Sequence, residues 1–310
     1  MPIKIPNELP AAQTLTKENI FFMTETRAMT QDIRALKILL LNLMPTKIAT
    51  ETQFARVLGN TPLQIELELI APSGREFKNT SHEHMLAFYK TFDQVKDQTF
   101  DGMIITGAPV EHLEFEEVDY WDELCQIMEW SKTHVHSTLH VCWGAQAALY
   151  YHYGINKHLL DKKLFGVYKH KVLDPNFVLF RGFDDEFYIP HSRHTTVYQE
   201  DIEKIPELKI LCTSEEAGVY AIKTDNGHQI YLFGHAEYDR DTLKKEYDRD
   251  VNEGKPIEIP VNYYPGDDPS MEPVMSWRSS GQMLYINWVN YFLYQTTPYD
   301  IKDISNEHKE

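Results

Sequence analysis

The sequence predicts an α/β fold with three layers, in which helices cover both faces of a mostly parallel central sheet. Apolar stretches typical of buried strands lie at residues 36–43, 63–69 and 100–106. Segments with apolar residues at helical spacing separate these strands. Strands that alternate with helices of about ten to fifteen residues form βαβ units, and such units build a parallel sheet.

The remaining elements follow in chain order. Helical spacing predicts helices at residues 50–58, 85–92, 120–130 and 145–151. A strand at 136–141 leads directly into Cys142. Shorter strands are expected after residue 177, at 208–214, 218–223 and 229–235, with a hairpin turn at Asn226-Gly227. The last expected elements are a helix followed by a long loop at 239–273 and a closing helix at 280–294.

No repeat, low-complexity tract or linker divides the sequence. At 310 residues the chain is long enough for one large α/β domain. We therefore predict a single catalytic domain at residues 35–298. An N-terminal extension, residues 1–34, is expected to pack on it, and residues 299–310 are expected to form a polar, frayed tail.

The charge and the cysteine content exclude several classes of partner. With 30 basic and 47 acidic residues the formal net charge is -17, which repels nucleic acid and anionic membranes. The N-terminus lacks the apolar run of a secretory signal, and no stretch reaches transmembrane length. Three scattered cysteines make neither a disulfide framework nor a metal motif, which predicts reduced thiols and a cytoplasmic protein.

Cys142 is the candidate nucleophile. It lies between a predicted strand and a predicted helix, the arrangement of a nucleophile elbow, in which the next residue, Trp143, offers its N–H to an oxyanion. The positive end of the helix favours the thiolate. A buried core thiol is the alternative, but Cys142 follows its strand, whereas Cys125 on a helical apolar stripe and Cys212 inside a strand are expected to be structural.

A thiol nucleophile needs a base, and the base needs a group that fixes its tautomer. His235 and Glu237 follow the strand at 229–235, and residues two apart in an extended chain project to the same side. We therefore predict a triad of Cys142, His235 and Glu237. The other histidines suggest no metal site: His134, His136 and His140 alternate along one predicted strand without matching ligands, and His191 and His194 flank Ser192 in a predicted polar loop.

Several motifs carry a family resemblance. The elbow VCWGAQA and the later HAE resemble the class I glutamine amidotransferase-like (flavodoxin-like) fold, although His140 replaces the Gly that usually lies two residues before the nucleophile. The motifs LNLMPTK, TGAPVE, HVCWGAQA, PHSR and GHAEYD, in that order, are similar to the homoserine O-acyltransferase family of methionine biosynthesis. The resemblance covers nearly the whole chain.

The resemblance implies a mechanism and its substrates. It implies an acyl-thioester on Cys142, ping-pong transfer from an acyl-CoA to L-homoserine, no cofactor, and a homodimer. It further implies homoserine-binding roles for Lys163, Ser192 and Arg249, and a place near the site for Lys47. From the sequence alone, the alternatives are a surface Lys, a loop Ser and an exposed helical Arg.

The acyl donor depends on Glu111. In the family, the residue after TGAPV separates succinyl-CoA users, with Gly, from acetyl-CoA users, and this chain has Glu111. Two like charges about 4 Å apart cost roughly 4 kcal/mol at an effective dielectric near 20, which disfavours succinyl. We therefore predict acetyl transfer from acetyl-CoA. The alternatives are succinyl transfer, a glutaminase, a silent regulator of the same fold, or an acidic solvated loop at Glu111 that touches no substrate.

Overall fold

The computed structural model describes residues 3–17, 22–25, 34–73, 79–298 and 301–304. The strands of these residues are β1 (Ile3–Ile5), β2 (Phe22–Thr24), β3 (Leu36–Leu41), β4 (Ile65–Ile70), β5 (Tyr89–Lys90), β6 (Phe100–Ile105), β7 (Val135–Val141), β8 (His158–Val172), β9 (Glu186–Thr196), β10 (Leu208–Ser214), β11 (Gly218–Thr224) and β12 (Gln229–Leu232). They form one 12-stranded sheet in the order β2-β1-β4-β3-β6-β7-β12-β11-β10-β8-β9, with β5 paired to β4.

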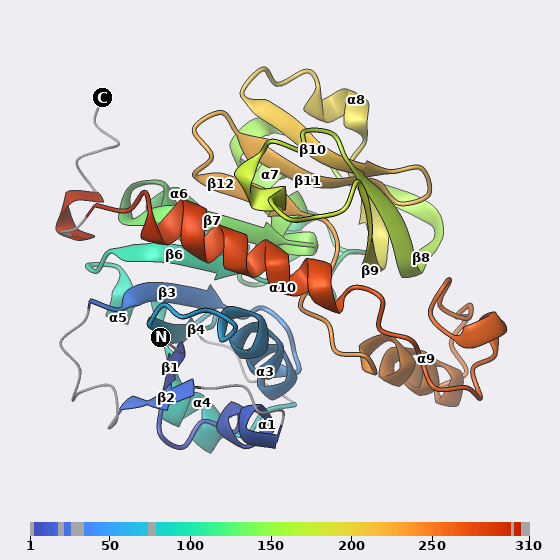
Figure 1. The fold of residues 1–310 in the computed structure, drawn as a ribbon, viewed down its shortest axis with the longest axis horizontal. Coiled ribbons are helices and arrows are strands. Elements are labelled where there is room, and N and C mark those ends of the chain that lie inside the picture. The colour runs from blue at the N-terminus through green and yellow to red at the C-terminus, as the bar shows by residue number, and fades with distance from the viewer. Residues whose placement is uncertain (1–2, 18–21, 26–33, 74–78, 299–300, 305–310) are drawn as a thin grey trace.

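Helices flank this sheet (Figure 1). They are α1 (Ala11–Lys17), α3 (Lys47–Leu58), α4 (His82–Phe88), α5 (Phe92–Val95), α6 (Trp121–His134), α7 (Trp143–Tyr153), α8 (Gln199–Ile202), α9 (Thr242–Asn252) and α10 (Arg278–Asn287). The last helix continues as a π-helix over Trp288–Tyr294, and short 3-10 turns cover Phe115–Glu117, Val178–Phe180, Pro265–Asp267 and Ile301–Asp303. The predicted closing helix is thus confirmed.

The central strands confirm the predicted parallel sheet. The strands β4, β3, β6, β7 and β12 pair in parallel, side by side. Every residue of β6 and β7 is buried, as expected of strands that helices cover on both faces. Their carboxyl ends meet at one edge of the sheet, where the loops of an open α/β fold form its site.

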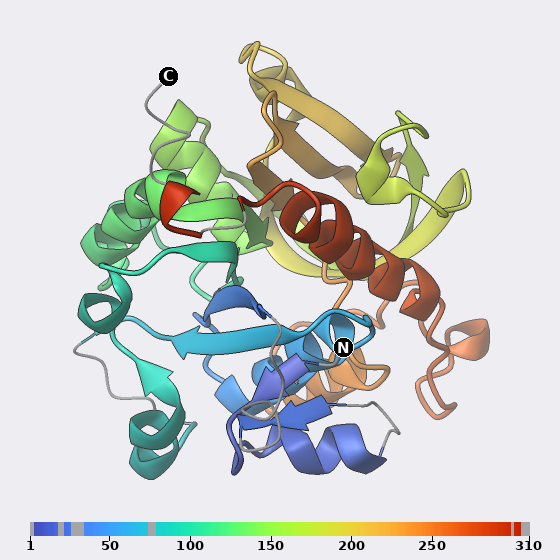
Figure 2. The ribbon, with the colours of Figure 1, turned by 60° about the vertical axis from the view of Figure 1, so that its left-hand side comes forward.

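Two hydrophobic cores lie on opposite faces of the sheet and make the three layers. Alternate residues of β3 join different cores, Leu40 on one face and Leu39 on the other. The first core includes Phe54 of α3 and Leu284 of α10, and the second includes Leu124 of α6 and Leu149 of α7. Figures 1 and 2 show α10 crossing one face of the central strands.

The N-terminal residues join the edge of the sheet. β1 pairs in parallel with β4, and β2 pairs in parallel with β1. The division into an extension, one domain and a tail remains a prediction. Of the predicted extension and tail, residues 1–2, 18–21, 26–33, 299–300 and 305–310 lie outside the described part of the chain.

The predicted helix at 85–92 is misplaced. Ser81 accepts the N–H of His84 at 3.2 Å and caps α4, which therefore begins before the apolar spacing indicated. The helix ends where Tyr89 turns to pair with β4. A second short helix, α5, starts only at Phe92.

The antiparallel half of the sheet holds the largest correction. The segment PHSRH is not a polar loop, because it lies within β9 and pairs with β8, a strand that the apolar pattern does not reveal. Pro190 is tolerated within this strand because β9 is the last strand of the sheet, where a residue without an N–H costs no ladder bond. His134 is also misplaced: it ends α6, and only His136 and His140 lie on β7.

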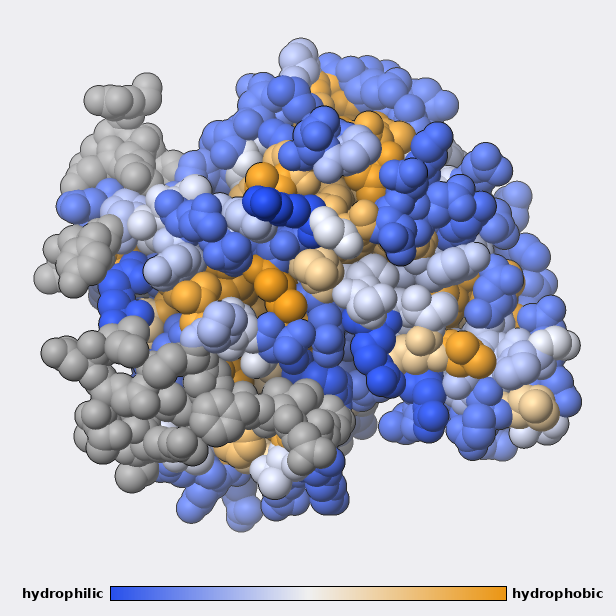
Figure 3. Space-filling model, in the orientation of Figure 1, coloured by the Kyte–Doolittle hydropathy of each residue, from blue (hydrophilic) through white to orange (hydrophobic). Residues whose placement is uncertain are grey.

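Figure 3 shows one face dominated by hydrophilic residues, with hydrophobic residues in small separate groups. Within the described ranges, no helix is both long and apolar enough to span a bilayer.

Candidate active site

Cys142 lies at a strained turn between β7 and α7. Its backbone has φ 52° and ψ -117°, a left-handed region that costs of order 1–3 kcal/mol in a residue with a side chain. The turn makes Cys142 the N-cap of α7. A Cβ at Gly144 would lie 2.6 Å from the carbonyl oxygen of Thr106, so only glycine lets α7 begin so close to β6. The predicted elbow is therefore confirmed as geometry.

His235 and Glu237 meet as predicted. The Nδ1 atom of His235 lies 2.7 Å from Oε1 of Glu237, and both side chains are buried. The His235 N–H donates to the carbonyl of Pro190 at 2.8 Å, which ties the end of β12 to β9. The His235 ring stacks on Tyr238, with ring centroids 4.1 Å apart. The hydroxyl of Tyr285 donates to Glu237 at 3.4 Å.

The thiol of Cys142 completes the triad. It hydrogen-bonds to His235, which thus contacts both Cys142 and Glu237. Burial opposes the charged imidazolium, but Cys142 and Glu237 outweigh burial and raise the pKa of His235 to about 10. The arrangement therefore places an imidazole, oriented by a carboxylate, against the Cys142 thiol, as a base for a cysteine nucleophile requires.

Gly107 forms a wall of the site that the sequence reading did not single out. A Cβ at this position would lie 3.2 Å from Cβ of Cys142 and 3.6 Å from Cε1 of His235. A larger residue would press on both members of the triad. The available signal was its position directly after β6, in the motif TGAPVE.

Glu111 is buried near the triad, so the alternative of an acidic solvated loop at this residue is wrong. It is 9% exposed, and its carboxylate accepts the N–H of His194 at 3.0 Å and the hydroxyl of Thr195 at 3.4 Å. Burial raises the pKa of Glu111, while the His194 N–H and the charges of Arg193 and His235 act against that shift.

Arg193 is a buried cation that the sequence reading missed. Its guanidinium donates to the carbonyls of Thr195 at 2.7 Å and Ala217 at 2.6 Å, which fixes it in place. Burial lowers the pKa of Arg193, and the nearby Cys142 and Glu111 oppose that shift. Since a guanidinium stays charged, Arg193 supplies a fixed positive charge behind both groups. The only signal was its place in the PHSR motif.

The three predicted homoserine-binding residues converge on Glu246 of α9. Lys163 Nζ lies 2.6 Å from its carboxylate, Ser192 Oγ lies 2.9 Å from it, and an Arg249 nitrogen lies 3.8 Å from it. Lys163 lies on β8 and Ser192 on β9, so they are not a free surface Lys and a loop Ser. Sequence reasoning missed Glu246.

This cluster consists of Lys163, Ser192, Glu246 and Arg249, and it lies beside the triad. We call it the homoserine cluster, after the role that the family resemblance implies. The pKa of Tyr238 is raised mainly by burial, and the nearby charges of Glu246 and Cys142 raise it further. Tyr238 stacks on His235, so it lies within electrostatic reach of both groups. Tyr238 therefore lies between the Glu246 cluster and the Cys142–His235 pair.

Lys47 is the first residue of α3 and is 1% exposed. Its ammonium donates to the carbonyl of Asn42, at the end of β3. The same segment also contacts the residue that follows β6, because the N–H of Leu43 donates to the hydroxyl of Thr106 at 2.8 Å. Lys47 is therefore linked to Thr106 through the backbone that follows β3.

The remaining histidines have structural contacts. His140 Nε2 lies 2.7 Å from Oε1 of Gln229, and burial lowers the pKa of His140 to about 3. His136 Nε2 lies 2.9 Å from the Thr296 hydroxyl. Among the residues that the structure describes, no group of three or more His, Cys, Asp or Glu side chains is placed to hold a metal ion.

A protein family and curated relatives match this chain over almost its full length. The match to the homoserine O-succinyltransferase family covers residues 2–299. A homoserine O-acetyltransferase of Clostridium novyi is 63% identical, over 97% of this chain and 100% of that protein. A homoserine O-acetyltransferase of Acetivibrio thermocellus is 59% identical, over 98% of this chain and 100% of that protein.

Solved structures show the fold. A glutamine amidotransferase from Thermotoga maritima superimposes with a TM-score of 0.54 at 13% identity, covering 84% of this chain and 100% of that chain. This likeness confirms the predicted amidotransferase-like fold and carries nothing further. The family match and the two close relatives establish more: the chain belongs to the homoserine O-succinyltransferase family.

Proposed function

We propose that the protein is a homoserine O-acetyltransferase of methionine biosynthesis, which moves an acetyl group from acetyl-CoA to the hydroxyl of L-homoserine. The observation that carries the proposal is Cys142 at a strained elbow, hydrogen-bonded to the buried His235–Glu237 pair. Family membership supports homoserine as the acceptor. The names of the two close relatives support acetyl as the transferred group.

In the first half-reaction the Cys142 thiolate attacks the thioester carbonyl of acetyl-CoA. The first N–H groups of a helix have no partner within it, so the N–H of Trp143 is available to the oxyanion. Such a donor is typically worth about 3–4 kcal/mol. His235 carries the thiol proton and gives it to the departing CoA thiolate, which leaves acetyl-Cys142 and a neutral imidazole.

In the second half-reaction homoserine takes the acetyl group. Neutral His235 accepts the proton of the homoserine hydroxyl, and the oxygen attacks the thioester of Cys142. Glu237 holds Nδ1 of His235, so Nε2 is the atom that accepts this proton. Collapse of the tetrahedral intermediate releases O-acetylhomoserine and restores the Cys142–His235 pair. No cofactor takes part in this scheme.

The homoserine cluster fits the two charged groups of an amino acid. The ammonium of homoserine would take the place of cations on the Glu246 carboxylate. Arg249 contacts Asp250 at 2.7 Å, and its exposed guanidinium would turn from that carboxylate to bind the homoserine carboxylate, while Lys163 adds a second positive charge. Ser192, whose hydroxyl lies on the same carboxylate, would orient Glu246.

Glu111 supports acetyl-CoA as the donor. The hydrogen bonds from His194 and Thr195 fix its carboxyl group in a buried position, where a Gly would leave open space. The longer succinyl group needs that space, and the two carboxylates would repel each other. Burial raises the pKa of Glu111. The carboxyl group crowds a succinyl chain whether or not it carries a charge.

Initial rates with each donor test the proposal. Purified protein, L-homoserine and either acetyl-CoA or succinyl-CoA should give O-acetylhomoserine rapidly and O-succinylhomoserine slowly. Varying both substrates should give parallel double-reciprocal lines, since the thioester separates the two half-reactions. Absence of O-acetylhomoserine, or glutamine hydrolysis in its place, would refute the proposal.

The proposal has two further parts. A catalytic thiolate needs a reducing compartment, which favours the cytoplasm. The homodimer implied by the family resemblance is proposed as the working assembly, and light scattering on the purified protein measures it.

A further inference from the structure

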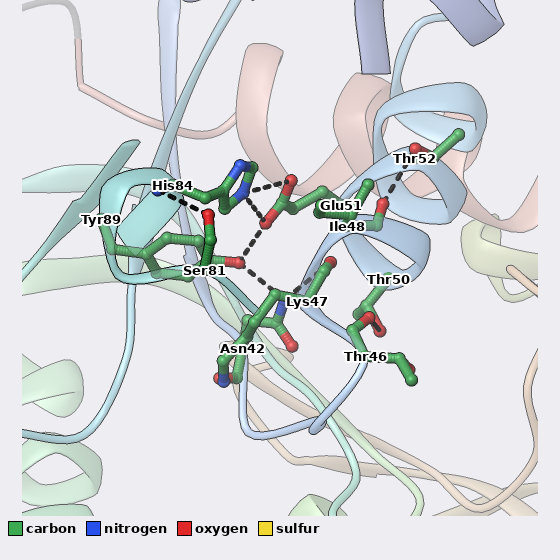
Figure 4. A network of polar contacts seen from close by, with 10 residues as sticks. All are labelled: Asn42, Thr46, Lys47, Ile48, Thr50, Glu51, Thr52, Ser81, His84 and Tyr89. Atoms are coloured by element: carbon green, nitrogen blue, oxygen red, sulfur yellow. Dashed lines mark hydrogen bonds and ion pairs between the residues drawn. The ribbon is translucent and has the colours of Figure 1, made fainter. Parts of the chain in front are cut away.

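A buried polar network connects α3, α4 and the end of β3 (Figure 4). Its centre is Glu51 of α3, whose side chain is fully buried. The His84 Nε2 atom lies 2.9 Å from Oε1 of Glu51, and the Tyr89 hydroxyl donates to the same oxygen at 2.6 Å. Nothing in the proposed mechanism uses these three side chains. Removing a carboxylate from water costs free energy, which its hydrogen bonds offset only in part. Such a network therefore suggests a role beyond stability.

Tyr89 passes the network on to Asn42. Burial, followed by the Glu51 carboxylate, raises the pKa of Tyr89, so the hydroxyl keeps its proton and donates it to Glu51. The same hydroxyl accepts Nδ2–H of Asn42 at 2.8 Å. Asn42 is the first residue after β3 and is fully buried.

Asn42 is held at each of its polar groups. Its amide nitrogen also donates to the carbonyl of Lys47 at 3.3 Å, and its Oδ1 accepts the N–H of Met44 at 3.2 Å. Its backbone N–H donates to the carbonyl of Ile70 at 3.0 Å, and its backbone carbonyl accepts the Lys47 ammonium. The Lys47 ammonium also lies 5.9 Å from the centre of the Tyr89 ring.

From Asn42 the contacts continue to the triad. The N–H of Leu43 donates to the Thr106 hydroxyl, and that hydroxyl donates to the carbonyl of Gly107 at 3.0 Å. Gly107 lies against Cys142 and His235. A Cβ added at Gly107 would lie 3.2 Å from Cβ of Cys142. A shift of the peptide after β3 would therefore move the wall behind the nucleophile.

We propose that Glu51, His84 and Tyr89 are positioning residues, which act through Lys47 and Asn42 to hold the backbone after β3 against the triad. The inference rests on the proposed function. A displacement of about 1 Å at a reacting group can lower a rate by about a hundredfold, so the loss of one support should be visible in kcat. These residues belong neither to the triad nor to the cluster proposed to bind homoserine, so KM should stay nearly constant.

Tyr89→Phe is the main test, because it removes one hydroxyl and keeps the ring beside Lys47. We expect kcat to fall by about tenfold, with both KM values within about twofold of the wild type. Glu51→Gln is the second variant and should act in the same direction. Thr52→Val is the matched control: Thr52 is the next residue of α3, and its hydroxyl donates only locally, to the carbonyl of Ile48 at 2.9 Å.

A double-mutant cycle separates positioning from a merely structural role. If the Tyr89 hydroxyl acts through Asn42, to which it is hydrogen-bonded, adding Tyr89→Phe to Asn42→Leu should lower kcat by less than about twofold more. Thermal melting confirms that each variant is folded. A wild-type kcat in Tyr89→Phe and in Glu51→Gln, or an equal loss from Tyr89→Phe with and without the Asn42 side-chain amide, would overturn the inference. Failure of the wild type to acetylate homoserine would instead refute the proposed function.

Discussion

At Cys142 the backbone and the charges both favour reaction. The positive φ of Cys142 places the side chain above the end of β7, and α7 directs its first N–H groups towards it. Around the sulfur lie the His235 imidazole and, behind it, the buried charge of Arg193. The candidate nucleophile thus lies among a helix N-terminus, an imidazole and a buried guanidinium.

His235 and Glu237 should contribute unequally. His235→Ala removes the proton acceptor of the second half-reaction, whereas Glu237→Gln leaves it present with weaker control of its tautomer. We expect kcat to fall by about 10⁴-fold or more in His235→Ala and by a smaller factor in Glu237→Gln. Steady-state rates of both variants measure this, and the opposite order would show that the two roles are misassigned.

Glu111→Gly should change the donor preference. The substitution opens the space that the buried carboxyl group fills and removes its charge. We expect kcat/KM for succinyl-CoA relative to acetyl-CoA to rise by at least about a hundredfold, which corresponds to roughly 3 kcal/mol. Glu111→Gln, which fills the same space, is the control and should keep the preference for acetyl-CoA. An unchanged donor ratio in the Gly variant would remove Glu111 from the account.

At the scale of elements, the elbow depends on how closely α7 approaches β6. The carbonyls of Thr106 and Ile105 would lie 2.6 Å and 3.0 Å from a Cβ at Gly144. These are backbone atoms, which cannot rotate away as a side chain can. Gly144 therefore fixes where the helix begins, and with it the position of Cys142.

Gly144→Ala tests this dependence. In a free helix the change would stabilise by about 1 kcal/mol, but here it should lower the free energy of unfolding by about 1–3 kcal/mol. It should also slow alkylation of Cys142 by iodoacetamide. The control is Gly154→Ala at the other end of α7. There φ is 68°, and an added Cβ would meet no atom within 4 Å apart from its own chain neighbours. That variant should lose stability through backbone strain alone and keep the wild-type alkylation rate; equal rates in both variants would contradict the argument.

At the scale of the whole molecule, buried histidines couple stability to pH. Burial lowers the pKa of His140 and His170 to about 3 and that of His152 to about 4, and it lowers the pKa of His191 well below its ordinary value. Below about pH 6.5 the unfolded chain binds protons at these residues and the folded chain does not. Their contribution to stability is therefore present above pH 6.5 and is lost as the pH falls towards 3.

The opposite shift at His235 does not cancel this loss. Its pKa is raised to about 10, so its contribution is lost as the pH rises towards 10 and is constant below about pH 6.5. We expect urea unfolding to show a decline of up to about 1.4 kcal/mol per pH unit for each buried histidine between pH 6.5 and 4.5. His140→Asn should make the decline shallower. A stability that does not change across this window would contradict the assignment.

The parallel half of the molecule could be predicted because its signals are local. Continuous apolar runs mark β3 and β6, and the strand–Cys–helix order marks the elbow. β8 and β9 could not be predicted, because polar residues such as Lys163 and Ser192, which contact Glu246, and Pro190 interrupt the apolar pattern. Glu246 could not be predicted either, since its partners lie 54 and 83 residues away in the sequence and only the folded sheet brings them together.

The central claim is that the acetyl group passes through Cys142 as a thioester. Mass spectrometry of the protein incubated with acetyl-CoA, without homoserine, tests it most directly. We predict one acetyl group on the peptide that contains Cys142, its loss when homoserine is added with formation of O-acetylhomoserine, and no acetyl group on Cys142→Ala. A full acetyl increment on Cys142→Ala, or normal turnover by that variant, would contradict the account.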